Sequence, residues 1–281
     1  MDHPPGGRAL SADATALIPD GLDATLVLVR HGESTFIAEG RFQGQADTPL
    51  TPIGLRQAAL VADRLASPHE APALPLPDGD PLELVHSPLL RTSQTANAID
   101  AAMRAAGHHV ARRPDQGFLE MDQGAWEGLH REEIAERFGP QLAAWRRTPL
   151  DAWAPDGESL PQMQARVRPA LVTILGRLAE GRAPGTHDRP QVPGYGDPRP
   201  DHPWSLIVGH DGIFKVALLT LFDLPLARFW MWSMDLCAIS VVEVRAGRPV
   251  LRAHNLTAHL ASLADARAVA ALEERAAGGA L

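Results

Sequence analysis

The chain has 281 residues, which allows one large domain or two small ones. Hydrophobic residues make up 45% of it, and glycine and proline together about a sixth, so the composition excludes a protein that is disordered throughout. The formal net charge of −8 argues against non-specific binding to nucleic acid or to an anionic membrane surface, and no apolar run reaches the roughly 18 residues of a membrane span.

The amino terminus is expected to form a flexible extension, up to about residue 23, ahead of a single domain over residues 24–281. Prolines and glycines such as Pro4 and Gly6 interrupt its first 20 residues, which lack the continuous apolar stretch of a signal peptide. We therefore expect a cytoplasmic protein with no membrane partner. The single cysteine, Cys237, has no partner for an internal disulfide and sits in an apolar run, as a small core residue does.

Three short apolar runs have the pattern of buried strands, and a histidine follows each of them closely. The runs cover residues 25–29, 82–85 and 206–209, and the histidines are His31, His86 and His210. Strands that alternate with amphipathic helical patterns are typical of α/β proteins with a parallel sheet. The sequence therefore predicts a three-layer, doubly wound α/β fold, with a mainly parallel sheet and helices on both of its faces.

Capping signals mark two of the helices. Thr51 is a candidate N-cap with Pro52 at the first helical position, for a helix that runs to about residue 66. Gly107 is a candidate stop signal for a second helix, over residues 89–106.

The rest of the domain is expected to add a cap and a closing pair of strands. Residues 129–180 have helical patterns without a clear strand, which predicts a helical cap region over the sheet. The closing strands are expected over residues 236–244 and 250–253, and an alanine-rich helix over about 260–277.

Two proline-rich segments, residues 67–81 and 183–203, are predicted to be mobile surface loops. Each enters a strand at its amino-terminal end, whereas ligands of open α/β sheets bind outside the carboxyl ends. We therefore expect both loops to lie on the edge opposite the site; a lid role is the alternative.

The side chains at the carboxyl ends of the predicted strands have a common chemistry. Arg30 and His31 end the first strand, Arg91 follows the second, and His210 ends the third. If these strands are neighbours, two arginines and two histidines line one crevice. Arginine binds phosphate oxygens as a fork and stays charged, and a neutral imidazole nitrogen can attack phosphorus. The crevice is therefore suited to a phosphoryl group.

The run Arg30-His31-Gly32-Glu33-Ser34 resembles the signature of the histidine phosphatase superfamily, in the branch that includes phosphoglycerate mutases and broad-specificity phosphatases. The resemblance covers roughly residues 26–244, with the motifs in the family's order. The other matching motifs are Arg41-Phe42-Gln43-Gly44, Pro49-Leu50-Thr51 with Gly54, Ser87-Pro88-Leu89-Leu90-Arg91-Thr92, Leu119-Glu120, Gly124-Ala125-Trp126-Glu127-Gly128, Gly157-Glu158-Ser159 and Gly209-His210. A lone Arg-His-Gly is a weak signal, but this ordered set is a strong one.

The resemblance implies a role for each of these residues. His31 would be the nucleophile that becomes a phosphohistidine, and Glu120 would be the proton donor to the leaving group. The phosphate pocket would consist of Arg30, Arg91 and His210. A phosphate monoester is a dianion with a poor leaving group, so fixed positive charge and a carboxylic acid both suit the reaction. The residues expected to bind the substrate in addition are Ser34, Gln43, Gly44 and Asp211.

Two positions depart from the family pattern. Ile37 stands where the family often has an asparagine that helps to hold phosphate, which suggests a more apolar leaving-group side. Asp211 replaces the usual glycine after His210. It either caps the helix that starts near Gly212, or faces the pocket and favours the imidazolium form of His210.

No motif points to a metal or an organic cofactor. The pair His108-His109 has no acidic or cysteine partner at a metal-ligand spacing, and the sequence has no zinc-binding helix motif or Walker loop. Phe36, Phe118 and Trp126 flank the expected pocket, where they either contact an apolar part of the substrate or pack in the core.

The expected function is hydrolysis of a small-molecule phosphate monoester, with the oligomeric state left open. A cofactor-dependent phosphoglycerate mutase is the alternative, because Trp145-Arg146-Arg147 resembles the paired arginines of a mutase. Against it, Met121-Asp122-Gln123 lacks the basic and tyrosine residues that a mutase usually has there. A binding module without catalysis is a third possibility, disfavoured because His31, Glu120 and the arginines are all present.

Overall fold

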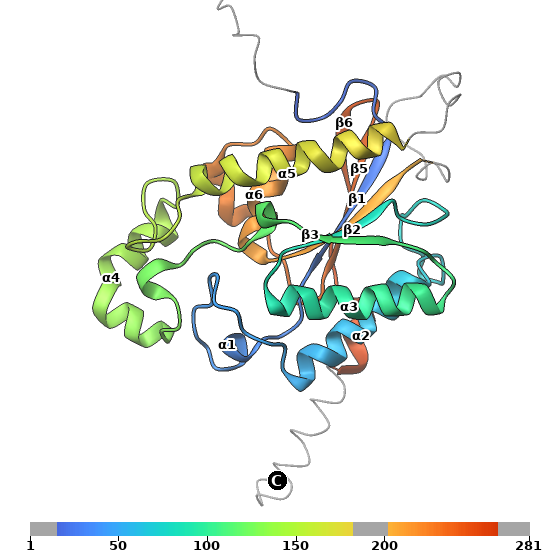
Figure 1. The fold of residues 1–281 in the computed structure, drawn as a ribbon. Coiled ribbons are helices and arrows are strands. Elements are labelled where there is room, and N and C mark those ends of the chain that lie inside the picture. Colours follow the sequence, from blue (N-terminus) through green and yellow to red (C-terminus); the bar gives the residue numbers. More distant parts are fainter. Residues whose placement is uncertain (1–15, 182–201, 264–281) are drawn as a thin grey trace, which may run out of the picture.

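A computed structural model describes residues 16–181 and 202–263 of the chain (Figure 1). At its centre is a six-stranded sheet with the order β3-β2-β4-β1-β5-β6. The strands are β1 (Ala24–Arg30), β2 (Glu83–His86), β3 (Ala111–Pro114), β4 (Trp204–Gly209), β5 (Ile239–Arg245) and β6 (Arg248–Leu256). β3, β2, β4 and β1 are parallel, whereas β5 runs antiparallel to both β1 and β6. The predicted mainly parallel sheet is confirmed.

Helices cover both faces of the sheet, as predicted. α2 (Pro52–Ala66) and α3 (Leu90–Ala105) lie on one face, and α5 (Leu160–Glu180) and α6 (Asp211–Leu221) lie on the other (Figure 1). The remaining helical segments are α1 (Thr35–Ala38), α4 (Arg131–Arg147) and the 3-10 turns η1 (Gln116–Phe118), η2 (Gly124–Trp126), η4 (Leu226–Met231) and η5 (Ala258–Leu260).

The predicted capping signals act as expected. Thr51 Oγ1 accepts a hydrogen bond of 3.0 Å from the Gly54 amide at the start of α2, with Pro52 as the first helical residue. Gly107 follows the end of α3 with a φ of +91°, a left-handed conformation that glycine adopts without a steric cost.

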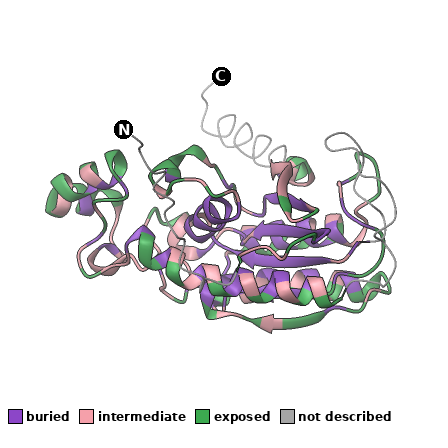
Figure 2. Cartoon of the chain, turned by 90° about the horizontal axis from the view of Figure 1, so that it is seen from above, coloured by how far each residue is buried: buried purple, intermediate pink, exposed green. Residues whose placement is uncertain are grey.

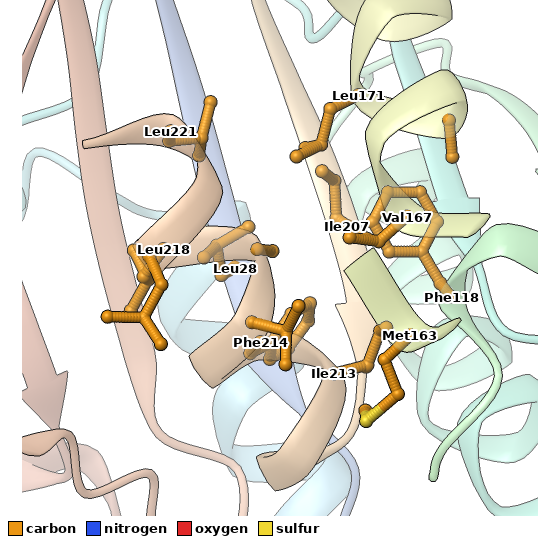
Figure 3. Close-up of a cluster of buried hydrophobic side chains, with 14 of the residues drawn as sticks. Leu28, Phe118, Met163, Val167, Leu171, Ile207, Ile213, Phe214, Leu218 and Leu221 are labelled. Carbon is orange, nitrogen blue, oxygen red and sulfur yellow. The ribbon is translucent and has the colours of Figure 1, made fainter. Parts of the chain in front are cut away.

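The central strands separate two hydrophobic cores. Leu28 faces α5 and α6 and packs in the cluster that contains Phe214 (Figure 3). Val27 and Val29 belong to the cluster on the side of α2 and α3. Cys237 lies in this second cluster and is fully buried, as expected of a small core residue. Because β1 and β4 are buried on both faces (Figure 2), their sequences are nearly continuous apolar runs rather than alternating ones.

The predicted cap region, residues 129–180, divides into two helices with different places in the fold. α5 buries Val167 and Leu171 against the sheet, so it is part of a layer and not of a cap. α4 extends beyond the sheet (Figure 1) and is kinked at Phe138, two residues before Pro140. A proline inside a helix removes a backbone hydrogen bond and accounts for the kink. The cap is therefore α4 alone.

The residues directly before β1 contact the rest of the domain. Leu22 is buried, its carbonyl accepts a hydrogen bond from the Gly247 amide, and Asp23 Oδ1 accepts one from the Ala246 amide, each at 2.8 Å. These contacts attach the segment before β1 to the turn between β5 and β6. Residues 1–15 of the predicted extension lie outside the described residues.

The segment 67–81 forms no helix or strand, but Leu74 and Leu76 are buried in the core on the side of α2 and α3. Residues 183–201 of the other predicted loop lie outside the described residues, as does most of the helix expected over 260–277. Within residues 16–181 and 202–263, no helix is long and apolar enough to cross a membrane.

Candidate active site

The carboxyl ends of β1 and β4 bring His31 and His210 together. The two strands are parallel neighbours with Arg30 opposite Gly209, so the residues that follow lie side by side. The ring centroids of His31 and His210 are 5.0 Å apart, and both rings are buried. The predicted convergence of the two histidines is confirmed.

The surroundings of His31 select its tautomer. Its Nδ1 lies 2.6 Å from the Gly32 carbonyl oxygen, which can only accept a hydrogen bond, so Nδ1 carries the proton. Nε2 is then the unprotonated nitrogen. Burial, followed by the positive charges of Arg91 and Arg30, holds the pKa of His31 well below its ordinary value. His31 is therefore a neutral imidazole with a lone pair on Nε2.

A close backbone approach fixes the loop after His31. A Cβ atom on Gly32 would lie 2.5 Å from the Gly54 carbonyl oxygen, and one on Gly54 would lie 2.0 Å from the Glu33 carbonyl oxygen. Both positions therefore require glycine, because any side chain would push this loop away from α2.

Arg91, at the start of α3, is fully buried and donates hydrogen bonds to three groups of the protein. Its Nη1 and Nη2 donate to the carbonyls of Ala46 and Gly44 at 2.7 Å each, and its Nε donates to His210 Nδ1 at 3.2 Å. Burial lowers the pKa of Arg91 to about 10, which keeps the guanidinium charged at neutral pH. One N–H of each Nη group is left to bind an anion.

The hydrogen bond from Arg91 also determines the tautomer of His210. Because Nδ1 accepts this bond, the proton of the neutral ring is on Nε2, which lies 2.9 Å from Ser87 Oγ. Burial, then the charge of Arg91, holds the pKa of His210 well below its ordinary value. His210 must exchange one of these two hydrogen bonds to contact a phosphate.

Arg30 supplies the second positive charge at the end of β1. Its Nη1 donates to the Met234 carbonyl, and its Nε is buried with no hydrogen-bond partner among the described residues. An unsatisfied buried donor of a guanidinium is costly. An anion in the crevice would remove this cost.

Glu120 lies between η1 and η2, and its carboxylate is held by three backbone amides. Oε1 accepts hydrogen bonds from Met121 at 2.8 Å and Ile213 at 3.0 Å, and Oε2 accepts one from Gly212 at 3.1 Å. Burial is the largest effect and raises the pKa of Glu120, and the negative charge of Asp211 adds to it. The carboxyl group therefore holds a proton more readily than an ordinary glutamate, and the amides stabilise it after the proton has left.

Arg166, on α5, holds the segment that carries Glu120. It donates to the carbonyls of Gly117, Leu119 and Glu120 at 2.8–3.0 Å, and it pairs with both carboxylate oxygens of Glu158. The sequence motifs included Glu158, but nothing in them linked Arg166 to Glu120, because the contact joins residues 46 positions apart.

Ser34 and Gln43 bind one another in the loop between β1 and α2. Gln43 Oε1 accepts hydrogen bonds from Ser34 Oγ and, at 2.8 Å, from Thr48 Oγ1. Gly44 has a φ of +51° and presents its carbonyl to Arg91. The expected substrate contacts of Ser34, Gln43 and Gly44 stay predictions, and of the three only Gly44 is hydrogen-bonded to Arg91.

The expectation that Asp211 caps α6 is wrong. α6 begins at Asp211, and the Glu120 carboxylate takes the amides of the first turn, those of Gly212 and Ile213. Asp211 instead pairs with Lys215 at 2.6 Å and lines the cavity beside Glu120. As the alternative expected, Asp211 faces the cavity. The imidazolium form of His210 is nevertheless disfavoured, because burial and the arginine charges hold the pKa of His210 well below its ordinary value.

Phe118 and Trp126, which flank the expected pocket in the sequence, are core residues. The cavity next to Glu120 has a volume of about 260 Å³, and its aromatic lining comes from Phe42, Trp145, Phe229 and Trp230. Phe229 and Trp230 belong to η4, which no sequence motif marked. Residues 16–181 and 202–263 contain no group of three or more histidine, cysteine or acidic residues that could hold a metal ion.

His108 has an acidic partner that the sequence spacing did not suggest. Its Nδ1 lies 2.6 Å from Asp80 Oδ1, although 28 positions separate the two residues.

The geometry combines an unprotonated nitrogen, two guanidinium groups and a carboxyl group of raised pKa. Such a set can bind a phosphate, attack its phosphorus atom and protonate the departing oxygen.

The chain matches the family model described as "Histidine phosphatase superfamily (branch 1)" over residues 26–184 and 197–257. It is 28% identical to phosphoserine phosphatase 1 of Hydrogenobacter thermophilus over 84% of this chain and 93% of that protein. It is 30% identical to glucosyl-3-phosphoglycerate phosphatase of Mycobacterium tuberculosis over 73% of this chain and 78% of that protein. It is also 30% identical to the probable phosphoglycerate mutase GpmB of Proteus mirabilis, over 77% of this chain and 83% of that protein.

Solved structures of similar fold include a phosphatase of the same name. The mycobacterial glucosyl-3-phosphoglycerate phosphatase in complex with VO3 superimposes with a TM-score of 0.66 at 26% identity, over 83% of this chain and 99% of that one. A structure named mycobacterial hydrolase 1 superimposes with a TM-score of 0.67 at 26% identity, over 84% and 100%.

Proposed function

Because the chain belongs to the histidine phosphatase superfamily, we propose that it is a phosphomonoesterase that hydrolyses a small organic phosphate through a phosphohistidine on His31. The observation that carries this proposal is the hydrogen bond from Nδ1 of His31 to the Gly32 carbonyl, since it leaves Nε2 as a nucleophile beside two arginines. Relatives named as phosphatases over most of the chain support the same activity.

In the first step, Nε2 of His31 forms a bond to phosphorus and the bond between phosphorus and the ester oxygen breaks. Glu120 gives its proton to that oxygen, so the alcohol leaves neutral. Oε2 suits this role because it accepts only the Gly212 amide. The amides of Met121, Gly212 and Ile213 then stabilise the carboxylate that remains.

In the second step, water attacks the phosphohistidine. The Glu120 carboxylate takes a proton from this water, the bond between phosphorus and Nε2 breaks, and inorganic phosphate leaves. Arg30 and Arg91 balance the charge of the phosphoryl group in both steps, and neither a metal nor an organic cofactor is part of the proposal. Gly44 supports the pocket, because its carbonyl orients Arg91.

The test is to trap the intermediate. The protein is mixed with a substrate labelled in its phosphate and quenched rapidly without acid. We expect a protein-bound label that acid removes and base spares, and its absence from His31→Ala. A variant that retains the label at the wild-type level would remove His31 from the proposal.

A phosphoglycerate mutase is the second candidate, because several relatives are named as probable mutases and Arg146 lines the cavity beside Glu120. The two functions differ in the acceptor of the phosphoryl group. Incubation with 3-phosphoglycerate and 2,3-bisphosphoglycerate separates them: a phosphatase releases inorganic phosphate, whereas a mutase forms 2-phosphoglycerate.

A further inference from the structure

The segment 234–238 leads into β5 and lies between the ends of two other strands. Ile239, the first residue of β5, is opposite Val29 of β1 on one side and opposite Leu256 of β6 on the other. The segment therefore has the residues that end β1 on one side and the end of β6 on the other. It connects the phosphate site to a part of the fold that the proposed reaction does not use.

The backbone of this segment is hydrogen-bonded to both site residues at the end of β1. The Ala238 carbonyl accepts a bond of 3.3 Å from the Arg30 amide. The Cys237 amide donates one of 3.3 Å to the His31 carbonyl. A displacement of the segment would therefore move the backbone at both residues.

The guanidinium of Arg30 depends on the same segment. Its Nη1 donates to the Met234 carbonyl, and its Nε is buried without a hydrogen-bond partner among the described residues. Across residues 16–181 and 202–263, the Met234 carbonyl is thus the only acceptor that the Arg30 side chain has. Because an arginine side chain has many rotamers, this single acceptor decides where the charge lies. Whatever fixes the Met234 carbonyl also orients the guanidinium.

Asn255, on β6, holds the residue next to Met234 with two hydrogen bonds. Its Oδ1 accepts the Asp235 amide at 2.7 Å, and its Nδ2 donates to Asp235 Oδ2 at 2.9 Å. The φ of Asn255 is +55°, in the left-handed region where asparagine is enriched. Its own amide donates to Ser240 Oγ at 3.1 Å, and that oxygen lies 3.7 Å from Met234 Sδ. The side chain and the backbone of Asn255 therefore both act on the position of Met234.

We infer that Asn255 is a positioning residue for the phosphate site. It holds Asp235, and thereby the Met234 carbonyl, in the place that directs the guanidinium of Arg30 toward a phosphoryl group beside His31. Asn255 itself does not touch the substrate and acts only through Arg30. The inference rests on the proposed function, in which Arg30 balances the charge of the phosphoryl group.

The first test measures the dissociation constant of inorganic phosphate by titration calorimetry, which needs no turnover. Asn255→Gly removes both side-chain hydrogen bonds, and glycine adopts the φ of +55° without a steric cost. We expect the dissociation constant to rise by about fivefold, as for the loss of one or two hydrogen bonds. Asn97→Ala removes the other asparagine of the chain, which is exposed on α3, and should leave the constant unchanged.

A double-mutant cycle separates the positioning of Arg30 from a merely structural role. Arg30→Met removes the guanidinium, so Asn255→Gly should not weaken phosphate binding further in that background. A rise by the same factor in both backgrounds would overturn the inference, because Asn255 would then act on the pocket without Arg30. An unchanged dissociation constant in Asn255→Gly would overturn it as well.

An exchange of the two partners gives a variant that keeps the pair. Asn255→Asp alone places two carboxylates side by side and should weaken phosphate binding as Asn255→Gly does. When Asp235→Asn is added, the introduced amide donates to the introduced carboxylate, which still accepts the backbone amide, and the wild-type constant should return. A double variant that binds phosphate as weakly as Asn255→Asp would overturn the inference, and this comparison decides it if Asn255→Gly does not fold.

Turnover is a separate readout. A wild-type protein that binds phosphate with this dependence on Asn255 and Arg30, but hydrolyses no phosphate ester, would contradict the proposed function and leave the role of Asn255 in place.

Discussion

The side-chain amide of Gln45 donates a hydrogen bond of 3.0 Å to the backbone carbonyl of Glu120. On either side of Gln45, Gly44 and Ala46 give their carbonyls to Arg91. One tripeptide therefore contacts both the arginine expected to bind the phosphate and the residue expected to protonate the leaving group. Gln45 is a positioning residue in this arrangement, because it acts through Glu120.

Gln45→Ala should lower kcat/KM for an alkyl phosphate by about tenfold, since a misplaced acid transfers its proton less efficiently. The loss on p-nitrophenyl phosphate should be smaller, because that leaving group needs little protonation. The measurement is kcat/KM on both substrates, with Gln141→Ala, an exposed glutamine of α4, as the control. An equal loss on the two substrates would show that Gln45 supports the pocket as a whole.

Gly44→Ala should weaken the phosphate pocket. A Cβ atom at Gly44 would lie 2.4 Å from Glu127 Oε2 and 2.9 Å from Gln123 Cβ, and the φ of +51° disfavours alanine by about 1–2 kcal/mol. The resulting shift moves the carbonyl that orients Arg91, so the inhibition constant of inorganic phosphate should rise several-fold.

Gly40→Ala is the matched control for this prediction. Gly40 has a similar φ of +72°, and no atom lies within 4 Å of its Cβ position. We expect Gly40→Ala to lose stability in thermal unfolding without weaker binding of phosphate. If both variants bind phosphate as the wild type does, the conformation of Gly44 does not control Arg91.

The sequence predicted the sheet and the convergence of His31 and His210, because both leave local patterns. The strands are apolar runs that end in His31 and His210, and parallel pairing brings those ends together. The interactions that support the site were not predictable in this way. Arg166 reaches Glu120 across 46 positions, and Phe229 reaches Trp145 from an unmarked 3-10 turn. Contacts of this kind depend on the assembled fold.

The error at Asp211 has a similar origin. An acidic residue before a helical run predicts an N-cap on local grounds. Here the carboxylate of Glu120, 92 positions from Gly212, occupies the amides that a cap would bind. The N-terminus of α6 is thus capped by the residue that we expect to be the general acid.

The buried neutral imidazole of His31 should make stability depend on pH. Its pKa is well below the ordinary value of 6.5 in the folded protein, so below about pH 6.5 the unfolded chain binds a proton there that the folded chain does not. The free energy of unfolding should therefore fall as the pH decreases from about 6.5, by up to about 1.4 kcal/mol per pH unit for this group.

His31→Asn removes this contribution and leaves the other titrating groups in place. Denaturant unfolding of both proteins between about pH 5 and pH 8 measures the difference. We expect a shallower decline for His31→Asn on the acid side and parallel curves above pH 7. Parallel curves over the whole range would mean that His31 titrates normally in the folded protein.

The role of Glu120 gives the most specific prediction, because a general acid matters in proportion to the basicity of the leaving group. An alkyl alcohol departs as a strongly basic alkoxide, so Glu120→Gln should lower kcat/KM for an alkyl phosphate by about 10²–10⁴-fold. p-Nitrophenolate departs without a proton, and its phosphate ester should lose far less. Inhibition by inorganic phosphate should change little, since Arg30 and Arg91 provide the positive charge.

Glutamine is the informative replacement because it keeps the shape of Glu120, and its single oxygen can still accept the backbone amides of Met121 and Ile213. Its NH2 group cannot accept the amide of Gly212, which bonds the other oxygen of Glu120. The cap of α6 is therefore largely retained, and thermal unfolding of the variant checks this. Equal losses on the alkyl and p-nitrophenyl esters in a folded variant would mean that Glu120 shapes the pocket without giving a proton. The proton would then have to come from another group, and Asp211, which lines the same cavity, is the carboxyl group to replace next.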